Sequence, residues 1–318
     1  MKVAPRTVTA PPATVAKPEP TSTPSVVAWT PQSERQDVFV GGAPLQELKL
    51  QGSITDPKVQ ISGMAWHGEQ LVLLPQWAKQ LYVLDKADVK AAVDGRAATL
   101  TPRELKVGPE GFADRFPGFE GFEAIAIVGE RAYLLAEAKQ GDDMFGYLVA
   151  GRMTAEGLEL DLDNIRTLPP ATRIKNMGYE ALLVAGDRLM VMPETNGGPR
   201  VAHSFGLDLE PLGALPMPEV SYRLTDSTPA DADGRFWVAN YHHPGDKGLP
   251  DAPRTEQLLP MQVTEQGVAA AGAPLHIALD MTQPGRNWEA VERLDERGFL
   301  VMTDEFPRAI FGFVPKAD

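Results

Sequence analysis

A hairpin-like segment that occurs five times is the feature that most restricts the fold of this chain. The five copies are "ISGMAWHGEQLVLLPQW" (61–77), "FEAIAIVGERAYLLAEA" (122–138), "YEALLVAGDRLMVMPET" (179–195), "TDSTPADADGRFWVANY" (225–241) and "WEAVERLDERGFLVMTDE" (288–305). Each contains a strand-like stretch, a polar turn and a more apolar second stretch. The copies start 46 to 63 residues apart, a period that predicts propeller blades of four short strands each.

The two ends of the chain complete this pattern. Only one further strand-like piece, "AIFGFVP" (309–315), follows the fifth hairpin. The missing outer strand is expected from the N-terminal "DVFVGG" (37–42) or "QELKLQG" (46–52), because an unpaired edge would otherwise remain. We therefore predict an all-β, five-bladed propeller closed by an N-terminal strand, with a sixth blade within 241–287 as the alternative. The one predicted helix lies in "KADVKAAVDG" (86–95).

The first 35 residues differ from the rest in composition. They are rich in Pro, Thr and Ala and lack the apolar core of a signal peptide. Such a segment cannot build a packed core, so residues 1–35 are expected to form a flexible tether and 36–318 a single propeller domain. Tethers of this kind often follow a cleaved signal or lipid anchor, which predicts an exported protein, periplasmic or on the cell surface. A cytoplasmic linker is the alternative.

Composition and missing motifs exclude several classes of protein. The formal net charge of −13 argues against a nucleic-acid-binding surface. No apolar run is long enough to span a membrane, and the absence of cysteine excludes disulfides, thiolate catalysis and cysteine-ligated zinc. The sequence contains no GxSxG elbow, HExxH, P-loop or GxGxxG helix start, which argues against a serine hydrolase. We expect a monomer that acts on a small molecule.

Polar residues, many of them acidic, stand at the hairpin ends that lie away from the turns. Residues whose numbers have a constant sum face each other in an antiparallel hairpin, which predicts direct pairs such as Glu123 with Glu137. The first members belong to innermost strands and should form a ring around the channel: Ser62, Glu123, Glu180, Asp226 or Ser227, and Glu289. The second members should form a concentric second ring: Gln76, Glu137, Glu194, Asn240 and Asp304.

Carboxylates that converge on a narrow channel repel one another or retain protons. A doubly charged cation removes this repulsion, and carboxylate and hydroxyl oxygens suit calcium better than zinc. We therefore predict that the first-ring residues hold a calcium ion. The alternative is a channel whose polar residues are solvated by water alone.

Long connections lie at the carboxylate end of the hairpins, at 108–121, 139–146, 196–203 and 241–257. Function is expected at this mouth, because binding residues collect on loops held by a rigid scaffold. The predicted catalytic residues are Glu137, Glu194, Asp304 and His242, which would orient water or act as a base. The predicted substrate-binding residues are Gln76, Trp77, Arg200, Asn240, Tyr241, His243 and Arg308. Solvated surface histidines and core packing of the aromatic residues are the alternatives.

Several phrases resemble a known family of bacterial propellers. They are "FEGFEAIAI", "NMGYEALLV", "YRLTDSTPADADGRFWVANYHHPGD" and "NWEAV", and they are similar to the family called esterase-like activity of phytase over residues 36–318. The first ring is also similar to that of calcium-dependent apyrases, five-bladed nucleotidases whose central ion is held by Glu and Ser of the inner strands. By position this similarity implies Ser62, Glu123, Glu180, Ser227 and Glu289 as ligands, with Asp226 a departure from the pattern.

Together these features predict a calcium-dependent hydrolase that acts on an ester, foremost a phosphoester, at the mouth with the long loops. A non-catalytic envelope protein with a structural calcium ion, whose loops bind a carbohydrate or a protein, is the first alternative. A lactonase or arylesterase with an apolar lid over the same kind of site is the second.

Overall fold

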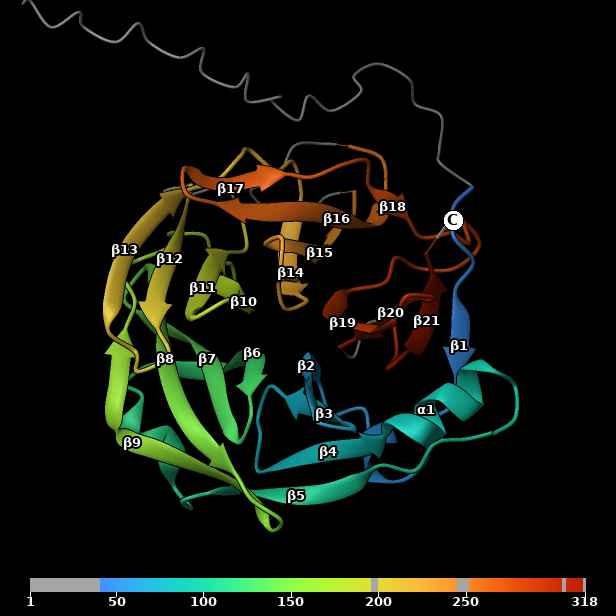
Figure 1. Cartoon of the computed structure of the whole chain (residues 1–318), viewed down its shortest axis with the longest axis horizontal. Coiled ribbons are helices and arrows are strands. Elements are labelled where there is room, and N and C mark those ends of the chain that lie inside the picture. Colours follow the sequence, from blue (N-terminus) through green and yellow to red (C-terminus); the bar gives the residue numbers. More distant parts are fainter. Residues whose placement is uncertain (1–40, 196–199, 245–251, 305–306, 317–318) are drawn as a thin grey trace, which may run out of the picture.

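Five groups of antiparallel strands surround one axis in the part of the chain that the computed structural model describes, residues 41–195, 200–244, 252–304 and 307–316. Figure 1 shows them as the blades of a closed ring, with β2, β6, β10, β14 and β19 nearest the centre. This arrangement confirms the predicted all-β, five-bladed propeller. The predicted tether, residues 1–35, lies outside the described residues.

Each blade has four strands, which run in order from the innermost to the outermost. The first blade contains β2 (Ile61–His67), β3 (Gln70–Pro75), β4 (Gln80–Asp85) and β5 (Arg103–Gly108). The second contains β6 (Phe119–Val128), β7 (Arg131–Gln140), β8 (Asp143–Met153) and β9 (Gly157–Thr167). The third contains β10 (Tyr179–Ala185), β11 (Arg188–Pro193), β12 (Val201–Gly206) and β13 (Pro211–Pro216). The fourth contains β14 (Arg223–Ser227), β15 (Arg235–His242), β16 (Thr255–Thr264) and β17 (Gly267–Ala270), and the fifth contains β19 (Trp288–Asp295), β20 (Gly298–Thr303), β21 (Phe311–Pro315) and β1 (Gln46–Leu48).

The segment 241–287, the alternative location for a sixth blade, belongs to the fourth blade. Its described part supplies β16, β17 and the short β18 (Leu275–His276), which pairs with β16, so the six-bladed alternative is wrong. The predicted helix is α1 (Lys86–Val93), and two short 3-10 helices are present, η1 (Ser53–Thr55) and η2 (Phe112–Arg115). None of the helices in the described ranges is long and apolar enough to cross a bilayer.

The N-terminal strand closes the ring. β1 pairs antiparallel with β21, with Gln46 facing Phe313 and Leu48 facing Phe311. This confirms the predicted closure and assigns it to "QELKLQG", since "DVFVGG" lies almost wholly outside the described residues. Arg308 reinforces the closure through two bonds from its guanidinium to the carboxylate of Glu47, 2.8 and 2.7 Å long. Blades one and two are also joined, because β5 pairs parallel with β9.

Apolar side chains fill five clusters, one between each pair of adjacent blades. Strand β3 illustrates the consequence. Its Leu71 and Leu73 pack into the cluster shared with the fifth blade, whereas Val72 and Leu74 pack into the cluster shared with the second. A strand with both faces buried needs apolar residues at consecutive positions, which explains why the second strand of each hairpin is so apolar.

A buried ion cluster fixes the fourth blade to the segment that leads into the fifth. The carboxylate of Glu256 accepts hydrogen bonds from Arg254 Nη2 at 2.7 Å, Arg286 Nε at 2.6 Å and Trp288 Nε1 at 2.7 Å. Both guanidinium groups are largely buried as well. One carboxylate therefore stands between two largely buried guanidinium groups.

Glu256→Gln is expected to lower the melting temperature by about 10 °C. The substitution removes the carboxylate charge that two buried guanidinium groups share, and breaking a buried pair of this kind costs about 3–5 kcal/mol. Thermal unfolding followed by circular dichroism measures the effect. Glu219→Gln is the control, because Glu219 pairs with Arg200 at the surface, where the loss is at most about 1 kcal/mol. Equal melting temperatures for the two variants would contradict the prediction.

Candidate functional site

A one-residue bulge interrupts the pairing near the start of every inner strand. At each bulge two residues of the inner strand face one residue of the neighbouring strand, so the bulged residue has no direct cross-strand partner and the strand bends. The bulged residues are Ser62, Glu123, Glu180, Thr225 and Glu289. The ring around the channel is thus marked by a repeated backbone irregularity.

These bulges correct the predicted register. Glu137 faces Gly121 instead of Glu123, and Asn240 faces Leu224 instead of Asp226. The constant-sum rule assumes an uninterrupted ladder, and the extra residue breaks that assumption. The following predicted direct pairs are therefore wrong: Ser62 with Gln76, Glu123 with Glu137, Glu180 with Glu194, Asp226 with Asn240, and Glu289 with Asp304.

Thr225, and neither Asp226 nor Ser227, is the bulged residue of the fourth blade. Its hydroxyl donates a hydrogen bond to the carbonyl oxygen of Trp288. Ser62 does the same in the first blade, donating to the carbonyl oxygen of Phe122 at 2.6 Å. In both cases the acceptor precedes the bulge of the next blade, so the two hydroxyl members of the ring connect adjacent blades.

Five glutamates from blades two, three and five form a cluster at the ring. Glu123, Glu137 and Glu194 are buried, and Glu180 and Glu289 are partly buried. Burial, followed by the charge of Glu137, raises the pKa of Glu123 well above its usual value, and burial and Glu194 do the same to the pKa of Glu180. The structure thus brings together these five predicted carboxyl groups.

The other members of the cluster are perturbed in the same direction. Burial raises the pKa of Glu137 to about 7, with the charge of Glu120 adding to it. The pKa of Glu289 rises to about 7 through burial and the nearby Asp304. Glu194 reaches a pKa of about 8, because burial outweighs the opposing effect of Arg223. Shifts of this size by burial and like charge are typical of functional sites.

The polar neighbours of these carboxyl groups are unevenly distributed. Gln76 Nε2 donates to Glu123 Oε1 at 3.2 Å, and the Tyr241 hydroxyl donates to Glu289 Oε1 at 2.8 Å. Arg223 Nη1 lies 3.0 Å from Glu194 Oε1. Sequence reasoning missed Arg223 and selected Arg200 and Arg308 as candidate cations. No sequence signal marks Arg223, because it precedes the repeated segment and only the pairing of β14 with β15 places it across from Tyr241.

Asp226 follows the bulged Thr225 on β14 and is fully buried. Its Oδ2 accepts a 2.8 Å hydrogen bond from the amide of Val291 in blade five, and the amide of Met64 in blade one also bonds its carboxylate. Burial raises the pKa of Asp226 and brings the pKa of the equally buried Glu292 to about 8. Asp226 therefore joins three inner strands through their backbone instead of belonging to the ring. Ser227 is buried beside it.

Each of the two arginines that were predicted to bind substrate is paired with a carboxylate outside the cluster. Arg200 pairs with Glu219 at 2.9 Å, and Arg308 binds Glu47 at the ring closure. Trp77 is 54% exposed and meets Phe119 edge-on, with ring centroids 5.7 Å apart. It is therefore an aromatic surface next to Gln76, not part of the core.

The predicted histidines are packed against aromatic rings. His242 is fully buried and stacks on Tyr222 with centroids 5.0 Å apart. His243 Nε2 lies 3.1 Å from Asn287 Oδ1. Asn240 donates to the carbonyl oxygen of Arg223 at 2.8 Å and accepts from Gln257 at 2.7 Å, so its amide is fixed by its neighbours.

The carboxyl cluster fits a hard cation in its chemistry. Glu137 Oε1 and Glu180 Oε2 are buried without a hydrogen-bond partner, which is costly for charged oxygens. Among the described residues, no three His, Asp or Glu side chains surround one point as metal ligands. Burial and the charges of neighbouring carboxylates raise the pKa of Glu180, Glu194 and Glu289 and so favour their protonated forms. A bound cation would relieve the same repulsion between ionised carboxylates.

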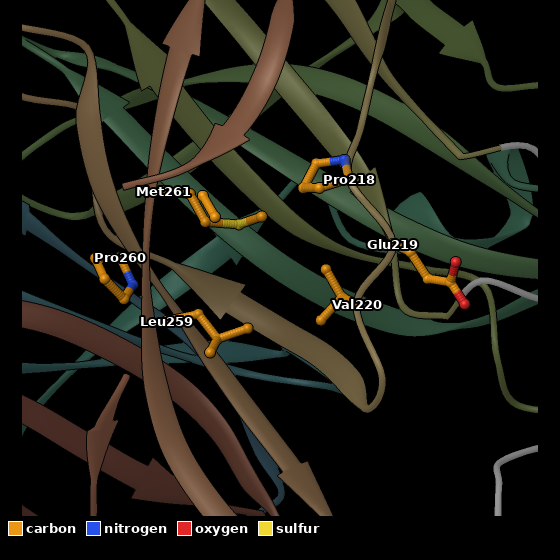
Figure 2. A pocket seen from close by; sticks show the side chains of 7 residues that line it. Pro218, Glu219, Val220, Leu259, Pro260 and Met261 are labelled. Atoms are coloured by element: carbon orange, nitrogen blue, oxygen red, sulfur yellow. The ribbon is translucent and has the colours of Figure 1, made fainter. Parts of the chain in front are cut away.

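Four hollows in the surface can be compared with the position of the carboxyl cluster. A cavity of about 10 Å³ reaches Glu194 between Arg200 and Tyr222, roughly the room that one water needs. Another hollow, of about 10 Å³, has a mostly apolar lining, and Figure 2 shows Pro218 and Val220 facing Leu259 and Met261 across it. Hollows of about 450 and 470 Å³ lie on blade two and at the ring closure, away from the carboxyl cluster. Residues 196–199 and 245–251 of the predicted mouth loops lie outside the described residues.

Comparisons with known proteins give similarity of overall shape only. No protein-family model matches the sequence, and no curated protein matches it. An exo-1,5-α-L-arabinanase from a bovine ruminal metagenomic library is 12% identical with a TM-score of 0.48, covering 83% of this chain and 94% of that one. A putative glycoside hydrolase from Parabacteroides distasonis is 11% identical with a TM-score of 0.46, covering 92% and 99%. These similarities are too distant to indicate function, and the resemblance to the esterase-like activity of phytase family stays a prediction.

Proposed function

We propose that this chain is a calcium-dependent hydrolase of ester or phosphoester substrates, acting where the carboxyl cluster meets the mouth of the propeller. The observation that carries the proposal is the cluster itself, in which glutamates from three blades are buried against one another with Arg223 as their nearby positive charge. A fold gains nothing in stability from such crowding. Crowded, perturbed carboxyl groups are typical of sites that bind cations or transfer protons.

The proposed cation-binding residues are the five at the bulges. Their side chains provide three carboxylates and two hydroxyls: Ser62, Glu123, Glu180, Thr225 and Glu289. When bound, calcium supplies positive charge that polarises the scissile ester. Sites with few carboxylates suit calcium at the concentrations found outside cells, which agrees with the proposed export of this protein.

The second-ring carboxyl groups are the proposed proton-transfer residues. Glu194 lies against the cavity with room for about one water, and its pKa of about 8 is close to that of a base working at neutral pH. Glu137 and Asp304 flank the ring and share the predicted role. His242 is stacked and buried, so we propose that it shapes this wall of the mouth.

Removal and return of calcium test the proposal. The melting temperature and the hydrolysis of p-nitrophenyl phosphate, bis-p-nitrophenyl phosphate and p-nitrophenyl acetate are measured in EDTA and after calcium is added. Turnover of any of these esters that calcium restores supports the proposal. Absence of a calcium response in both assays would remove the ion and the function together.

A structural calcium ion is the second candidate function. The burial of Glu123 and Glu194 favours it, because a cation between blades would stabilise the closed ring by mass action even without a substrate. A rise in melting temperature with calcium, together with no turnover of the three esters, would select this candidate. The loops would then bind a carbohydrate or a protein.

Trp77→Ala is expected to lower kcat/KM for p-nitrophenyl acetate about tenfold while the melting temperature stays within about 2 °C. The exposed indole beside Gln76 offers an apolar lip to an aryl ester, and an aromatic contact is worth up to about 1.5 kcal/mol. Leu212→Ala is the matched control, since Leu212 is equally exposed on the outer strand β13. Equal activity of both variants would exclude a contact between the Trp77 indole and the aryl group of the ester.

A further inference from the structure

Two of the three ring glutamates accept a hydrogen bond from a side chain of the preceding blade. Gln76, just after β3 of the first blade, donates to Glu123 of the second at 3.2 Å. Tyr241, on β15 of the fourth blade, donates to Glu289 of the fifth at 2.8 Å. In each pair Oε1 of the glutamate is the atom that accepts the bond.

The backbone around Gln76 holds its side chain in place. The backbone N–H of Gln76 donates to the backbone carbonyl oxygen of Gln60 at 2.7 Å. The backbone carbonyl oxygen of Gln76 accepts from the backbone N–H of Phe122, the residue before Glu123, at 2.8 Å. Gly121 gives the side chain its space. It has a φ of +144°, and a Cβ there would lie 2.3 Å from Gln76 Cγ. A side chain at position 121 would therefore displace the Gln76 side chain from its contact with Glu123.

Tyr241 is held from both sides. It is 1% exposed, and the guanidinium of Arg223, its direct cross-strand neighbour, lies 5.9 Å from its ring centre. The ring of His243 packs against it at 5.0 Å, and His243 in turn meets Asn287 at 3.1 Å. The hydroxyl that reaches Glu289 therefore has little freedom to move.

Glu180 stands in contrast to these two glutamates. Its Oε2 is buried without a hydrogen-bond partner, and its charged neighbours are other glutamates, first of all Glu194. The carboxyl groups of the ring therefore differ in how firmly the protein orients them.

We propose that Gln76 and Tyr241 are positioning residues that restrict the side chains of Glu123 and Glu289 and thereby favour cation binding, while the cation itself orients Glu180. The inference rests on the proposed calcium site. Partners that orient metal ligands typically contribute 10- to 100-fold to metal affinity. Both residues were predicted from sequence as substrate contacts, and this role differs from that one because it acts through a carboxylate.

Calcium affinity measured by isothermal calorimetry on the full chain tests this inference. Tyr241→Phe and Gln76→Met each keep the side-chain volume and remove the hydrogen bond, and each is expected to weaken calcium binding by about tenfold or more. Tyr179→Phe is the matched control. Tyr179 is also a buried tyrosine at this mouth, but its hydroxyl lies 2.9 Å from His203 Nε2 instead of a ring carboxylate, so its calcium affinity should change less than about twofold.

The outcomes separate this inference from the proposed function. Wild-type protein that binds calcium, with Tyr241→Phe and Gln76→Met binding as tightly, overturns the positioning role alone. Equal losses in Tyr179→Phe also overturn it, because a general loosening of the mouth would then be the cause. Wild-type protein that binds no calcium overturns the proposed function and the inference with it. Gln76→Met, in another blade, provides the measurement if the Tyr241 variant does not fold.

Discussion

Replacing Glu180 with glutamine is expected to raise the melting temperature of the calcium-free protein by about 5 °C and to abolish its stabilisation by calcium. Glutamine has nearly the same shape as glutamate, but it brings no charge into a cluster where burial and Glu194 disfavour ionisation. The same change removes a proposed cation ligand. The affinity for calcium should therefore fall by more than the roughly 10- to 100-fold that the loss of an orienting partner costs.

Thermal unfolding of wild type and Glu180→Gln, in EDTA and in excess calcium, measures both effects. Glu256→Gln is an informative comparison because the same chemical change there removes the carboxylate that two buried arginines share, which should lower the melting temperature in both buffers. The hydrolysis of the three p-nitrophenyl esters is followed in parallel. A calcium-free Glu180→Gln protein that melts below wild type would show that the Glu180 charge is compensated, which would contradict the prediction.

The stability of the calcium-free protein is expected to fall as pH rises from 5 to 8, with a loss of about 10 °C or more in melting temperature. Glu292 has a pKa of about 8 in the folded chain against an ordinary 4.5, and Glu194, Glu137 and Glu289 are raised to about 8, 7 and 7. Between the ordinary pKa of 4.5 and these raised pKa values, the folded state holds protons that the unfolded chain has released. Unfolding is therefore increasingly favoured up to about pH 8, where the dependence levels off.

Melting curves at half-unit pH intervals, in EDTA and in calcium, check this sign. Calcium should flatten or reverse the slope, because a cation stabilises the ionised carboxylates. Glu292→Gln separates the contributions, since Glu292 lies three residues beyond the ring and is not a proposed ligand. This variant should reduce the slope in EDTA and leave the calcium response unchanged. Stability that rises with pH in EDTA would mean that the cluster is ionised in the folded protein.

Much of the fold follows from the sequence because hairpins are local. The turns "HGEQ", "VGER" and "AGDR" place β2–β3, β6–β7 and β10–β11 where the repeat predicts them. The last hairpin is followed by only one further strand, which predicts that the N-terminal β1 supplies the missing outer strand, since a sheet edge needs a partner. The convergence of Glu123, Glu180 and Glu289 also follows, because they occupy equivalent positions in blades around one axis.

The bulges are what sequence reasoning could not supply. An extra residue in one strand leaves the apolar pattern of its hairpin intact, so the register looks continuous in the sequence. In the fourth blade the sequence therefore predicts Asp226 for the ring, because it is the acidic residue at that position, whereas the bulge lies at Thr225. Arg223 was missed for a related reason. It precedes the repeated segment, and only the pairing of β14 with β15 places it opposite Tyr241.

The joining of β1 to β21 has a consequence for how the molecule is made. β1 is synthesised before the five inner strands, whereas β21, with which it pairs, is synthesised after them. A nascent chain that stops before residue 311 has no β21, so its fifth blade lacks two of its four strands. Four blades can assemble during translation, but the blade that holds Glu289 is completed only when β1 pairs with β21. An ion that binds at the ring is therefore expected to find its full set of ligands in place only after this last pairing has formed.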